Sequence, residues 1–281
     1  LAGFPCQAFS IAGYQQGFDD AKGRGTLFFE LMRFVRQHNP RVVFLENVKN
    51  LVSHDHGNTF KVILEELSKA GYEGKISYKV MNAMTYGNIP QNRERIYIVA
   101  FRDTEDFTRF KMPEPIPLTT ALHDVIDFAG RVDPKYYYTK EHCLFYDKLQ
   151  EAVLRNDTVY QWRRQYIREN KSGVVPTLTA NMGTGGHNVP IIRCWNGSFR
   201  KLTPKECFNI QGFPKEFQLP KKQGNTQLYK QAGNSVVVPV IQRIAEAIAL
   251  AVGEEPVHDN IPSIILPDLC GIIPFENRQV K

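Results

Sequence analysis

Cys6 has a sequence context that suits a reactive thiol. A proline precedes it, polar residues follow it, and a glycine-containing loop occupies residues 13–25. Residues 1–4 have the character of a strand end, so Cys6 is predicted at the carboxyl end of a strand, where open α/β sheets bind ligands. A thiolate there would be a nucleophile. The alternative is a buried, inert cysteine, the common state of a lone cysteine.

Glu46 is the second candidate for chemistry. It follows an apolar run at residues 42–45, which predicts a strand buried on both faces. A carboxylate at the end of such a strand lies at the functional edge of the sheet. Because this strand comes one unit of strand and helix after Cys6, the two side chains can converge on one pocket. A helix cap or a solvated turn is the alternative role for Glu46.

Two arginines form the third candidate. Arg93 and Arg95 belong to the run Gln-Asn-Arg-Glu-Arg at residues 91–95, directly before an apolar stretch. Side chains alternate along an extended chain, so both arginines are predicted on one side, at the mouth of the sheet. They would provide a fixed pair of hydrogen-bond donors. A surface ion pair through Glu94 is the alternative.

Alternating strand and helix patterns would position these groups. Thr26 is a candidate cap for a helix with one apolar face at residues 27–35, which Asn39 and Pro40 would end. Another amphipathic helix is predicted at residues 60–67. Strands are predicted at residues 42–45, 76–80 and 96–101. This order is typical of an α/β fold with a doubly wound, mostly parallel, Rossmann-like sheet.

A proline-rich stretch at residues 112–117 marks a change in character along the chain. The segments that follow are short, with aromatic, basic and glycine-rich patches, which favours a smaller, partly β domain. Thr203, Pro204 and Glu206 then predict a capped helix start. A last apolar helix is predicted at residues 236–252.

The composition limits the class of protein. The net charge is +6 and the pI is about 9.0, which fits a soluble basic protein or a polyanion partner. The five cysteines include no Cys-x-x-Cys pair, which argues against a disulfide framework and a zinc site. No apolar run is long enough to predict a membrane span, and no secretory signal precedes the first strand. A cytoplasmic protein is expected.

The candidate segments resemble motifs of the DNA (cytosine-5)-methyltransferase family, of the prokaryotic restriction–modification type. Residues 3–10 match its Pro-Cys nucleophile motif, residues 46–48 its Glu-Asn-Val motif, and residues 91–101 its Gln-x-Arg-x-Arg motif. Further segments match in the order of the family, at residues 176–181, 200–214 and 229–240. The ordered set covers nearly the whole chain from residue 3 to about residue 252.

The resemblance implies transfer of a methyl group from S-adenosylmethionine to carbon 5 of a cytosine flipped out of double-stranded DNA. Cys6 would attack carbon 6 of the ring. Glu46 would hold the N3 and amino edge, for which a raised pKa is expected. Arg95 would bind the cytosine O2, and Arg93 would help to orient the base and the catalytic loop.

The resemblance also implies binding residues. The residues expected to contact the cofactor are Pro5, Leu27, Asn234 and Ser235, and the last two are expected to open a helix whose amides suit a carboxylate. The loop at residues 11–24 would be a mobile lid. The residues expected to bind DNA are Gln7, Ser10, Lys22, Arg24, Arg163, Arg164, Arg168, Lys171, Thr179 and Asn181. The expected domains are a catalytic part at 1–118, a target-recognition domain with hinge at 119–228, and a return to the catalytic domain with a tail at 229–281.

The sequence departs from the family in one respect. The family's glycine-rich cofactor loop and the acidic residue for the ribose are not found before Leu1 or in the early chain. A truncated sequence, a complementing chain that supplies them, or a degraded gene product would each explain this. A non-catalytic or partner-dependent DNA-binding subunit is therefore an alternative, although such a module has no need of Cys6 and Glu46. A cysteine hydrolase is another, with a base chosen from His54, His56 and His187.

Overall fold

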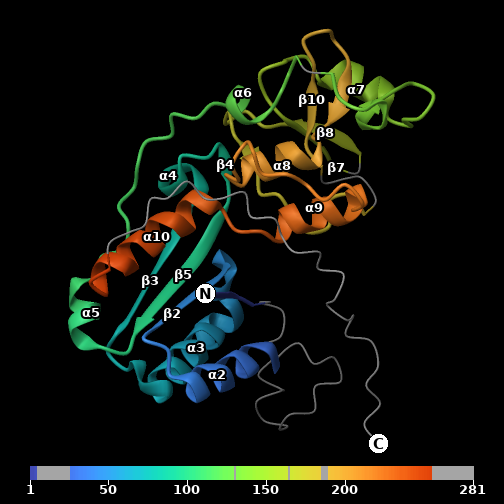
Figure 1. Ribbon diagram of the computed structural model, residues 1–281. Coiled ribbons are helices and arrows are strands. Elements are labelled where there is room, and N and C mark those ends of the chain that lie inside the picture. The colour runs from blue at the N-terminus through green and yellow to red at the C-terminus, as the bar shows by residue number, and fades with distance from the viewer. Residues whose placement is uncertain (5–25, 130, 164, 185–188, 255–281) are drawn as a thin grey trace, which may run out of the picture.

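The computed structural model describes residues 1–4, 26–129, 131–163, 165–184 and 189–254. Several predicted features lie outside these ranges: the lid, the tail after residue 254, and the individual residues Pro5, Cys6, Gln7, Ser10, Lys22, Arg24, Arg164 and His187. The described elements form two layered groups (Figure 1).

The first group is built on a four-stranded sheet in the order β1-β2-β5-β3. Its strands are β1 (Ala2–Gly3), β2 (Val42–Val48), β3 (Ile76–Asn82) and β5 (Glu94–Phe101). β1 is parallel to β2, while β2 and β3 are both antiparallel to β5. Three of these four strands run in one direction and β5 runs against them. The described sheet is therefore mixed rather than mostly parallel as expected, because β5 is inserted antiparallel between β2 and β3.

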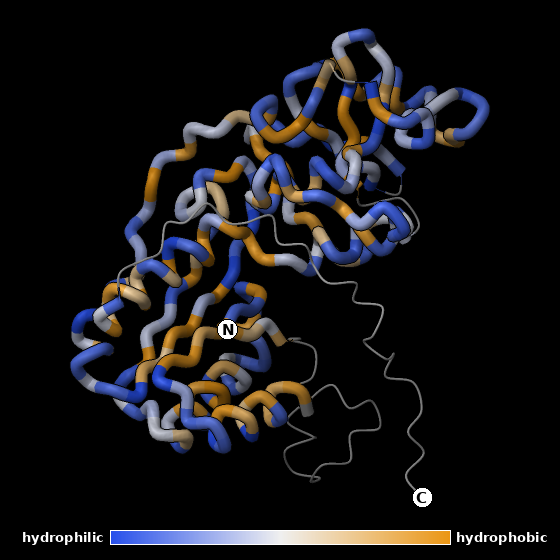
Figure 2. Tube along the Cα trace, viewed as in Figure 1, coloured by the Kyte–Doolittle hydropathy of each residue, from blue (hydrophilic) through white to orange (hydrophobic). Residues whose placement is uncertain are grey.

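Helices cover both faces of this sheet (Figure 1). One face packs against α2 (Thr26–His38) and α3 (Asn58–Leu67), and the other against α4 (Ala83–Gly87), α5 (Thr104–Arg109) and α10 (Val238–Ala251). Figure 2 shows the apolar segments along the strands and the helix faces turned toward them. The predicted strands and helices of this part are confirmed, with α2 ending at His38 directly before Asn39.

Alternation along β5 explains why a near-continuous apolar run forms this central strand. Ile96, Ile98 and Ala100 belong to the core under α2 and α3. The intervening Tyr97, Val99 and Phe101 belong to the core under α10. Because successive side chains point to opposite faces, a strand with helices on both sides must be apolar at nearly every position.

The second group is built on a five-stranded antiparallel sheet in the order β6-β11-β10-β7-β8. Its strands are β6 (Tyr137–Tyr138), β7 (Tyr160–Arg163), β8 (Tyr166–Glu169), β10 (Ile191–Arg193) and β11 (Phe199–Lys201). The helices around it are α6 (Leu122–Val125), α7 (Tyr146–Ala152), α8 (Pro204–Ile210) and α9 (Asn225–Asn234).

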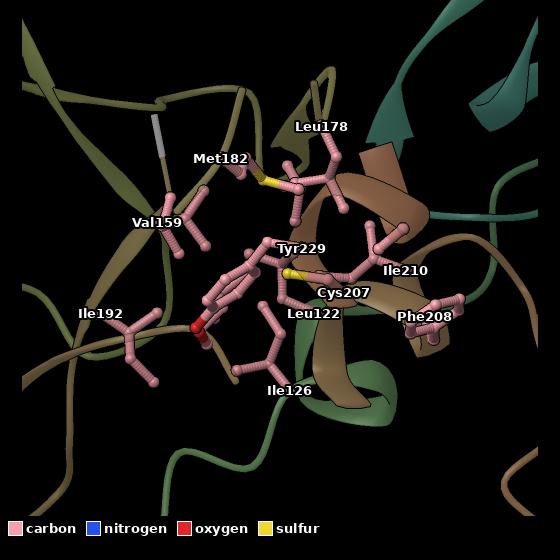
Figure 3. Close-up of a cluster of buried hydrophobic side chains, with 14 of the residues drawn as sticks. Leu122, Ile126, Val159, Leu178, Met182, Ile192, Cys207, Phe208, Ile210 and Tyr229 are labelled. Atoms are coloured by element: carbon pink, nitrogen blue, oxygen red, sulfur yellow. The ribbon is translucent and has the colours of Figure 1, made fainter. Parts of the chain in front are cut away.

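The core of the second group lies around Tyr229 and Cys207 (Figure 3). Tyr229 donates a hydrogen bond from its hydroxyl to the carbonyl of Leu202, so the polar end of this buried ring is satisfied. The start of α8 has the predicted capping box, in which Thr203 and Glu206 bond each other's backbone N–H. Glu206 also forms a buried ion pair with Arg200 at 2.7 Å.

A short parallel ladder joins the two groups. β4 (Gln91–Asn92) leads into β5 and pairs with β9 (Val175–Pro176) of the second group. The proline-rich connection at residues 110–121 contains no helix or strand, as its composition predicted. The strand that carries the two candidate arginines is thus tied directly to the second group.

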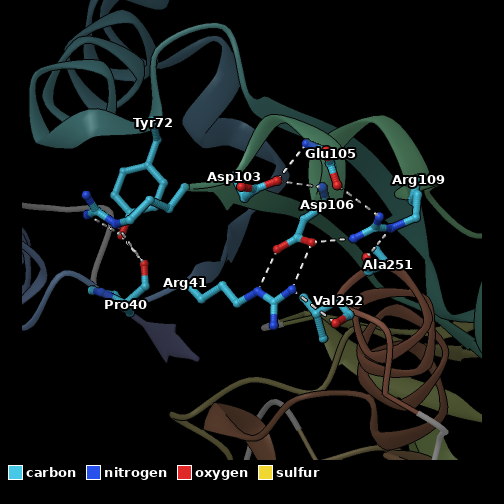
Figure 4. Close-up of polar contacts among 10 residues, drawn as sticks. Pro40, Arg41, Tyr72, Asp103, Glu105, Asp106, Arg109, Ala251 and Val252 are labelled. Carbon is cyan, nitrogen blue, oxygen red and sulfur yellow. Dashed lines mark hydrogen bonds and ion pairs between the residues drawn. The ribbon is translucent and has the colours of Figure 1, made fainter.

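The last turn of α10 is held by a buried carboxylate (Figure 4). Asp106 accepts hydrogen bonds from Arg41 at 2.6 and 2.9 Å and from Arg109 at 2.6 Å. The same two arginines donate to the carbonyls of Val252 and Ala251, at 3.0 and 2.7 Å. Cations suit the end of a helix, where carbonyls lack partners. The hydrogen bond from Arg41 holds the pKa of Asp106 below its ordinary value.

Residues 225–251 have, among the described residues, the length and hydropathy of a membrane span. The stretch is two helices, α9 and α10, separated at Ser235–Val237. Their lengths are 10 and 14 residues, and a helix needs about 20 to cross a bilayer. Val240, Ile244 and Ala251 of α10 are buried against the first sheet, so its apolar character serves the core.

Candidate active site

Glu46 and Arg95 meet because β5 runs antiparallel to β2. The register places Val48 opposite Arg95 and Glu46 opposite Tyr97, so the end of one strand lies beside the start of the other. Arg95 Nε lies 3.1 Å from Glu46 Oε1, and both side chains are about 15% exposed. The carboxylate is therefore part of a strand and pairs with an arginine, which excludes the helix-cap role.

The surroundings of Glu46 raise the pKa of its carboxyl group. Burial raises its pKa above the ordinary 4.5, and this outweighs the positive charges of Arg95 and Arg93, which lower it. Arg95 donates one further hydrogen bond, from Nη1 to the carbonyl of Glu94 at 2.9 Å. Within the described residues its Nη2 has no hydrogen-bond partner, so it can donate to a bound group. Glu94 instead pairs with Lys49 at 2.9 Å.

The strand that leads to Cys6 lies beside Glu46. Gly3 is directly opposite Glu46 in the parallel β1–β2 pair, and a Cβ added at Gly3 would lie 3.5 Å from Glu46 Oε2. The buried Asn47 donates from Nδ2 to the carbonyl of Phe4 at 2.8 Å, which fixes the chain just before Pro5. The motif residue after the carboxylate thus anchors the nucleophile segment.

Arg93 is placed differently from Arg95. It is 3% exposed and lies between β4 and β5. Its guanidinium donates to the carbonyls of Leu178, Gly233 and Ser235 at 2.7, 3.1 and 2.8 Å, while Nε has no partner in the part of the chain that the structure describes. Burial, with repulsion from Arg95, lowers its pKa to about 10. Arg93 therefore joins the start of β5 to the segment after β9 and to the turn between α9 and α10.

The residues expected at the cofactor lie on two elements. Leu27 is 51% exposed on α2. Asn234 is the last residue of α9, and Ser235 follows it, three residues before α10 begins at Val238. The expectation that Asn234 and Ser235 open a helix is wrong, because Val236 and Val237 remain extended before Pro239 takes the first turn. The helix-terminus argument for a bound carboxylate does not apply to them.

Gly233 shows how closely the second group packs on this turn. A Cβ at Gly233 would lie 2.2 Å from the carbonyl carbon and oxygen of Thr179 and 2.5 Å from the nitrogen of Ala180. These are backbone atoms, so they cannot move aside as a flexible side chain would. Only glycine fits here.

Gly233→Ala is expected to destabilise the protein by about 3 kcal/mol, because the added methyl group forces two backbones apart. Gly224→Ala is the matched control, since a Cβ there meets nothing within 4 Å and φ is −67°. Its effect should stay within about 0.5 kcal/mol. Chemical denaturation of both variants provides the measurement, and equal stabilities would contradict this packing.

The expected DNA-binding residues fall in two places. Thr179 and Asn181 are exposed in the turn that follows Leu178, close to Arg93. Arg163 and Arg168 are exposed on the β7–β8 hairpin, away from that turn. Lys171 is exposed beyond β8.

The β7–β8 hairpin has one apolar and one polar face. Trp162 is buried and stacks on Phe145 at 4.3 Å, so it belongs to the core. On the opposite face the side-chain oxygen of Gln161 accepts from Arg163 at 2.8 Å and Arg168 at 3.0 Å. Gln161 thereby sets the orientation of both guanidinium groups, a role that the alternation of the strand alone did not reveal.

Residues that the sequence argument passed over also build the site. Gln91 and Gln211 are both fully buried and hydrogen-bonded to each other. The signal for Gln91 was its place at the head of the Gln-x-Arg-x-Arg run. Nothing local distinguishes Gln211, because its partners are distant in sequence.

Solved structures share the architecture of this chain. The structure of a methyltransferase from Entamoeba histolytica, EhMeth, superposes with a TM-score of 0.62 at 20% sequence identity, covering 90% of this chain and 77% of that one. A likeness at this identity establishes the fold alone, an α/β sheet with a second, smaller part.

The family is set by the sequence comparisons. The model of the C-5 cytosine-specific DNA methylase family matches residues 1–250. The Type II methyltransferase M.Bsp6I of Bacillus sp. (strain RFL6) is 59% identical over 248 residues, covering 88% of this chain and 77% of the relative. M.HhaI of Haemophilus parahaemolyticus is 38% identical over 273 residues, covering 91% and 76%. This chain belongs to the C-5 cytosine-specific DNA methylase family, and it uses S-adenosylmethionine to methylate cytosine in DNA.

Proposed function

We propose that Cys6, Glu46 and Arg95 carry out the methylation, on a cytosine flipped out of double-stranded DNA. The observation that supports this most is the Glu46–Arg95 ion pair. The carboxyl group of Glu46 has a raised pKa, and Arg95 Nη2 has no hydrogen-bond partner among the described residues. Cys6 follows Gly3, the neighbour of Glu46, by three residues. Three residues span at most about 11 Å, a length compatible with the proposed role of Cys6 beside Glu46.

The chemistry begins with the Cys6 thiolate, which forms a bond to carbon 6 of the ring. Glu46 donates a proton to N3, so the displaced electron pair makes carbon 5 nucleophilic without leaving a charge on the ring. Arg95 holds O2 and fixes the ring plane. Carbon 5 then takes the methyl group. Methylation leaves a positive charge on the ring. A base, relayed through water, removes the proton on carbon 5, which restores the double bond to carbon 6 and expels the thiolate, and N3 returns its proton to Glu46.

S-adenosylmethionine supplies that methyl group as an electrophile when bound. The described residues fit one side of a pocket for it: the exposed apolar side chain of Leu27, and Asn234, whose exposed amide has no hydrogen-bond partner among the described residues. Ser235 and Pro5 would complete this side. The carbonyl of Ser235 accepts from Arg93 and its hydroxyl donates to the carbonyl of Ala232, so the hydroxyl oxygen could only accept a hydrogen bond from a ligand.

We also propose that a glycine-rich loop completes the cofactor pocket beside β1, carried either by the same polypeptide or by a complementing chain. Among the described strands β1 is an edge strand, paired only with β2. Leu27 and Phe34 on the neighbouring α2 are 51% and 57% exposed. An edge strand beside an apolar surface can accept another strand with its helix.

Target recognition is assigned to residues 119–228, between the catalytic part at 1–118 and the returning segment at 229–281. Arg163 and Arg168 are oriented side by side on the hairpin, and arginine is suited to reading guanine. Thr179 and Asn181, near Arg93, would contact the DNA around the flipped base. The other proposed DNA contacts are Gln7, Ser10, Lys22, Arg24, Arg164 and Lys171. We place the protein in the cytoplasm, as the methyltransferase of a restriction–modification system, by likeness to its Type II relatives.

Covalent trapping tests the mechanism. A pool of random-sequence duplexes containing 5-fluorocytosine, with S-adenosylmethionine, is expected to form an adduct stable to denaturation, because fluorine on carbon 5 cannot leave as a proton does. Mass spectrometry of the digested adduct should place it on Cys6. An adduct on buried Cys143, Cys194 or Cys207 would refute the assignment. DNA binding without any adduct would favour the non-catalytic alternative.

A further inference from the structure

Gln211 contacts two parts of the active site at once. It follows α8 as its C-cap residue and is 0% exposed. Its side-chain nitrogen donates to the carbonyl of Ala232 at 2.8 Å, and its side-chain oxygen accepts from Gln91 Nε2 at 3.2 Å. Its backbone carbonyl accepts from the N–H of Val238 at 2.9 Å. One residue therefore reaches both ends of the turn between α9 and α10.

Gln91 continues this contact into the catalytic sheet. It is also 0% exposed, and it lies in β4, four residues before Arg95. Its nitrogen donates to the carbonyl of Ile210 at 3.0 Å, and its oxygen accepts from the N–H of Leu178 at 3.1 Å. Every polar atom of the two buried glutamine side chains thus has a partner.

Fully bonded amides in a buried setting have one favoured orientation, because each alternative leaves a donor or an acceptor unpaired. The pair therefore acts as a rigid spacer between β4 and the carbonyl of Ala232. Ser235 Oγ donates to that same carbonyl at 2.8 Å, so the spacer ends on the turn that carries Asn234 and Ser235.

We propose that Gln211 is a positioning residue, which holds the turn bearing Asn234 and Ser235 in register with the strand bearing Arg95. The inference rests on the proposed function, in which these residues face the cofactor and the target base. Methyl transfer needs the two reacting carbons in line and in contact, so a small shift between these two elements lowers the rate at saturation.

Gln211→Met tests the spacer, because methionine has nearly the same length and volume but cannot make the two hydrogen bonds. Hydrogen exchange of the full chain, which requires no activity, should show about tenfold faster exchange of the amides of Leu178, Ser235 and Val238. Amides in the middle of the β2–β5 pair should keep the wild-type rate. Gln242→Met is the matched control, since Gln242 is exposed on α10 and contacts only Glu246.

Gln91→Met also removes the hydrogen bond between the two glutamines, but it leaves the bond from Gln211 to Ala232. It should therefore speed the exchange of the Leu178 amide more than that of the Val238 amide. In the double variant, the exchange of these amides should be no faster than in the single variant with the faster exchange. Uniformly faster exchange across the chain, or no local change in either variant, would overturn the proposal. Failure of Gln211→Met to fold would leave Gln91→Met to decide it.

The kinetic readout separates positioning from packing. In Gln211→Met, kcat at saturating DNA and S-adenosylmethionine should fall about tenfold, while the folded fraction measured by circular dichroism stays at the wild-type level. A loss of activity that only tracks the loss of folded protein would overturn the positioning role. If the wild-type chain forms no methylated product, the proposed function fails, and the exchange measurements still decide whether Gln211 couples the two elements.

Discussion

Cys6→Ala is expected to lower methyl transfer by about 10⁴-fold or more, while binding to DNA persists. The reason is that the reaction has no other way to place an electron pair on carbon 5 of cytosine. Alanine leaves the pocket nearly unchanged in shape, so contacts to the flipped base and to the phosphates remain. Methylation measured with labelled S-adenosylmethionine, beside an electrophoretic binding assay, gives both quantities.

Cys143→Ala is the control for this experiment. Cys143 is a buried, unpaired thiol in the core behind the β7–β8 hairpin, and burial raises its pKa, so it is a poor nucleophile. The control should keep its methylation rate. Comparable methylation rates for wild type and Cys6→Ala would contradict the proposed mechanism, whatever the binding assay shows.

Glu46→Gln is expected to lower the rate by about 10²–10⁴-fold, because glutamine can hold the amino edge of cytosine but cannot give a proton to N3. Glu94→Gln is the matched control. Glu94 belongs to the next strand, its side chain is 41% exposed, and its carboxylate pairs only with Lys49. That pair is a surface one, so its loss should alter the rate less than twofold.

The raised pKa of Glu46 gives this variant a second signature. A carboxyl group whose pKa is higher in the folded state stabilises the fold below its unfolded value, near 4.5, and that contribution disappears as the pH rises through the folded pKa. At neutral pH the ionised Glu46 therefore costs stability, and neutral glutamine removes the cost. Glu46→Gln should have the higher Tm at pH 7, and the difference should shrink toward pH 4. A lower Tm of the variant at pH 7 would contradict the burial argument.

The first sheet could be predicted from the sequence because its signals are local. The runs at β2 and β5 are apolar at nearly every position, and proline, asparagine and glycine mark the ends of the flanking helices. The nucleophile, carboxylate and arginine segments were likewise identified from short motifs. Nothing in such motifs states the direction of a strand, so the antiparallel placement of β5, which joins Arg95 to Glu46, required the structure.

The contacts that tie the two groups together could not be predicted in this way. Gln211 and Gln91 are 120 residues apart, and neither has a neighbour that indicates its partner. Asn234 and Ser235 were placed at a helix start because an apolar helical pattern follows them, yet α10 begins only at Val238, with Val237 as its extended N-cap. Packing of Gly233 against Thr179 limits where this turn can lie, and that restriction depends on chain segments that meet only in the folded state.

The ends of the five-stranded sheet have a consequence for how such proteins diversify. β6 is its first strand along the chain and β11 its last, and the two pair with each other, Tyr138 opposite Phe199 and Tyr137 opposite Arg200. The module therefore leaves and rejoins the rest of the molecule at neighbouring points. A sheet of different sequence can replace the segment between these two strands without moving the rest of the molecule. The replacement must keep a segment equivalent to β9, with which Gln91 and Arg93 form their hydrogen bonds. Under the proposed assignment of target recognition to this module, new DNA specificities can arise by exchange at this junction without a change in the residues proposed for the reaction.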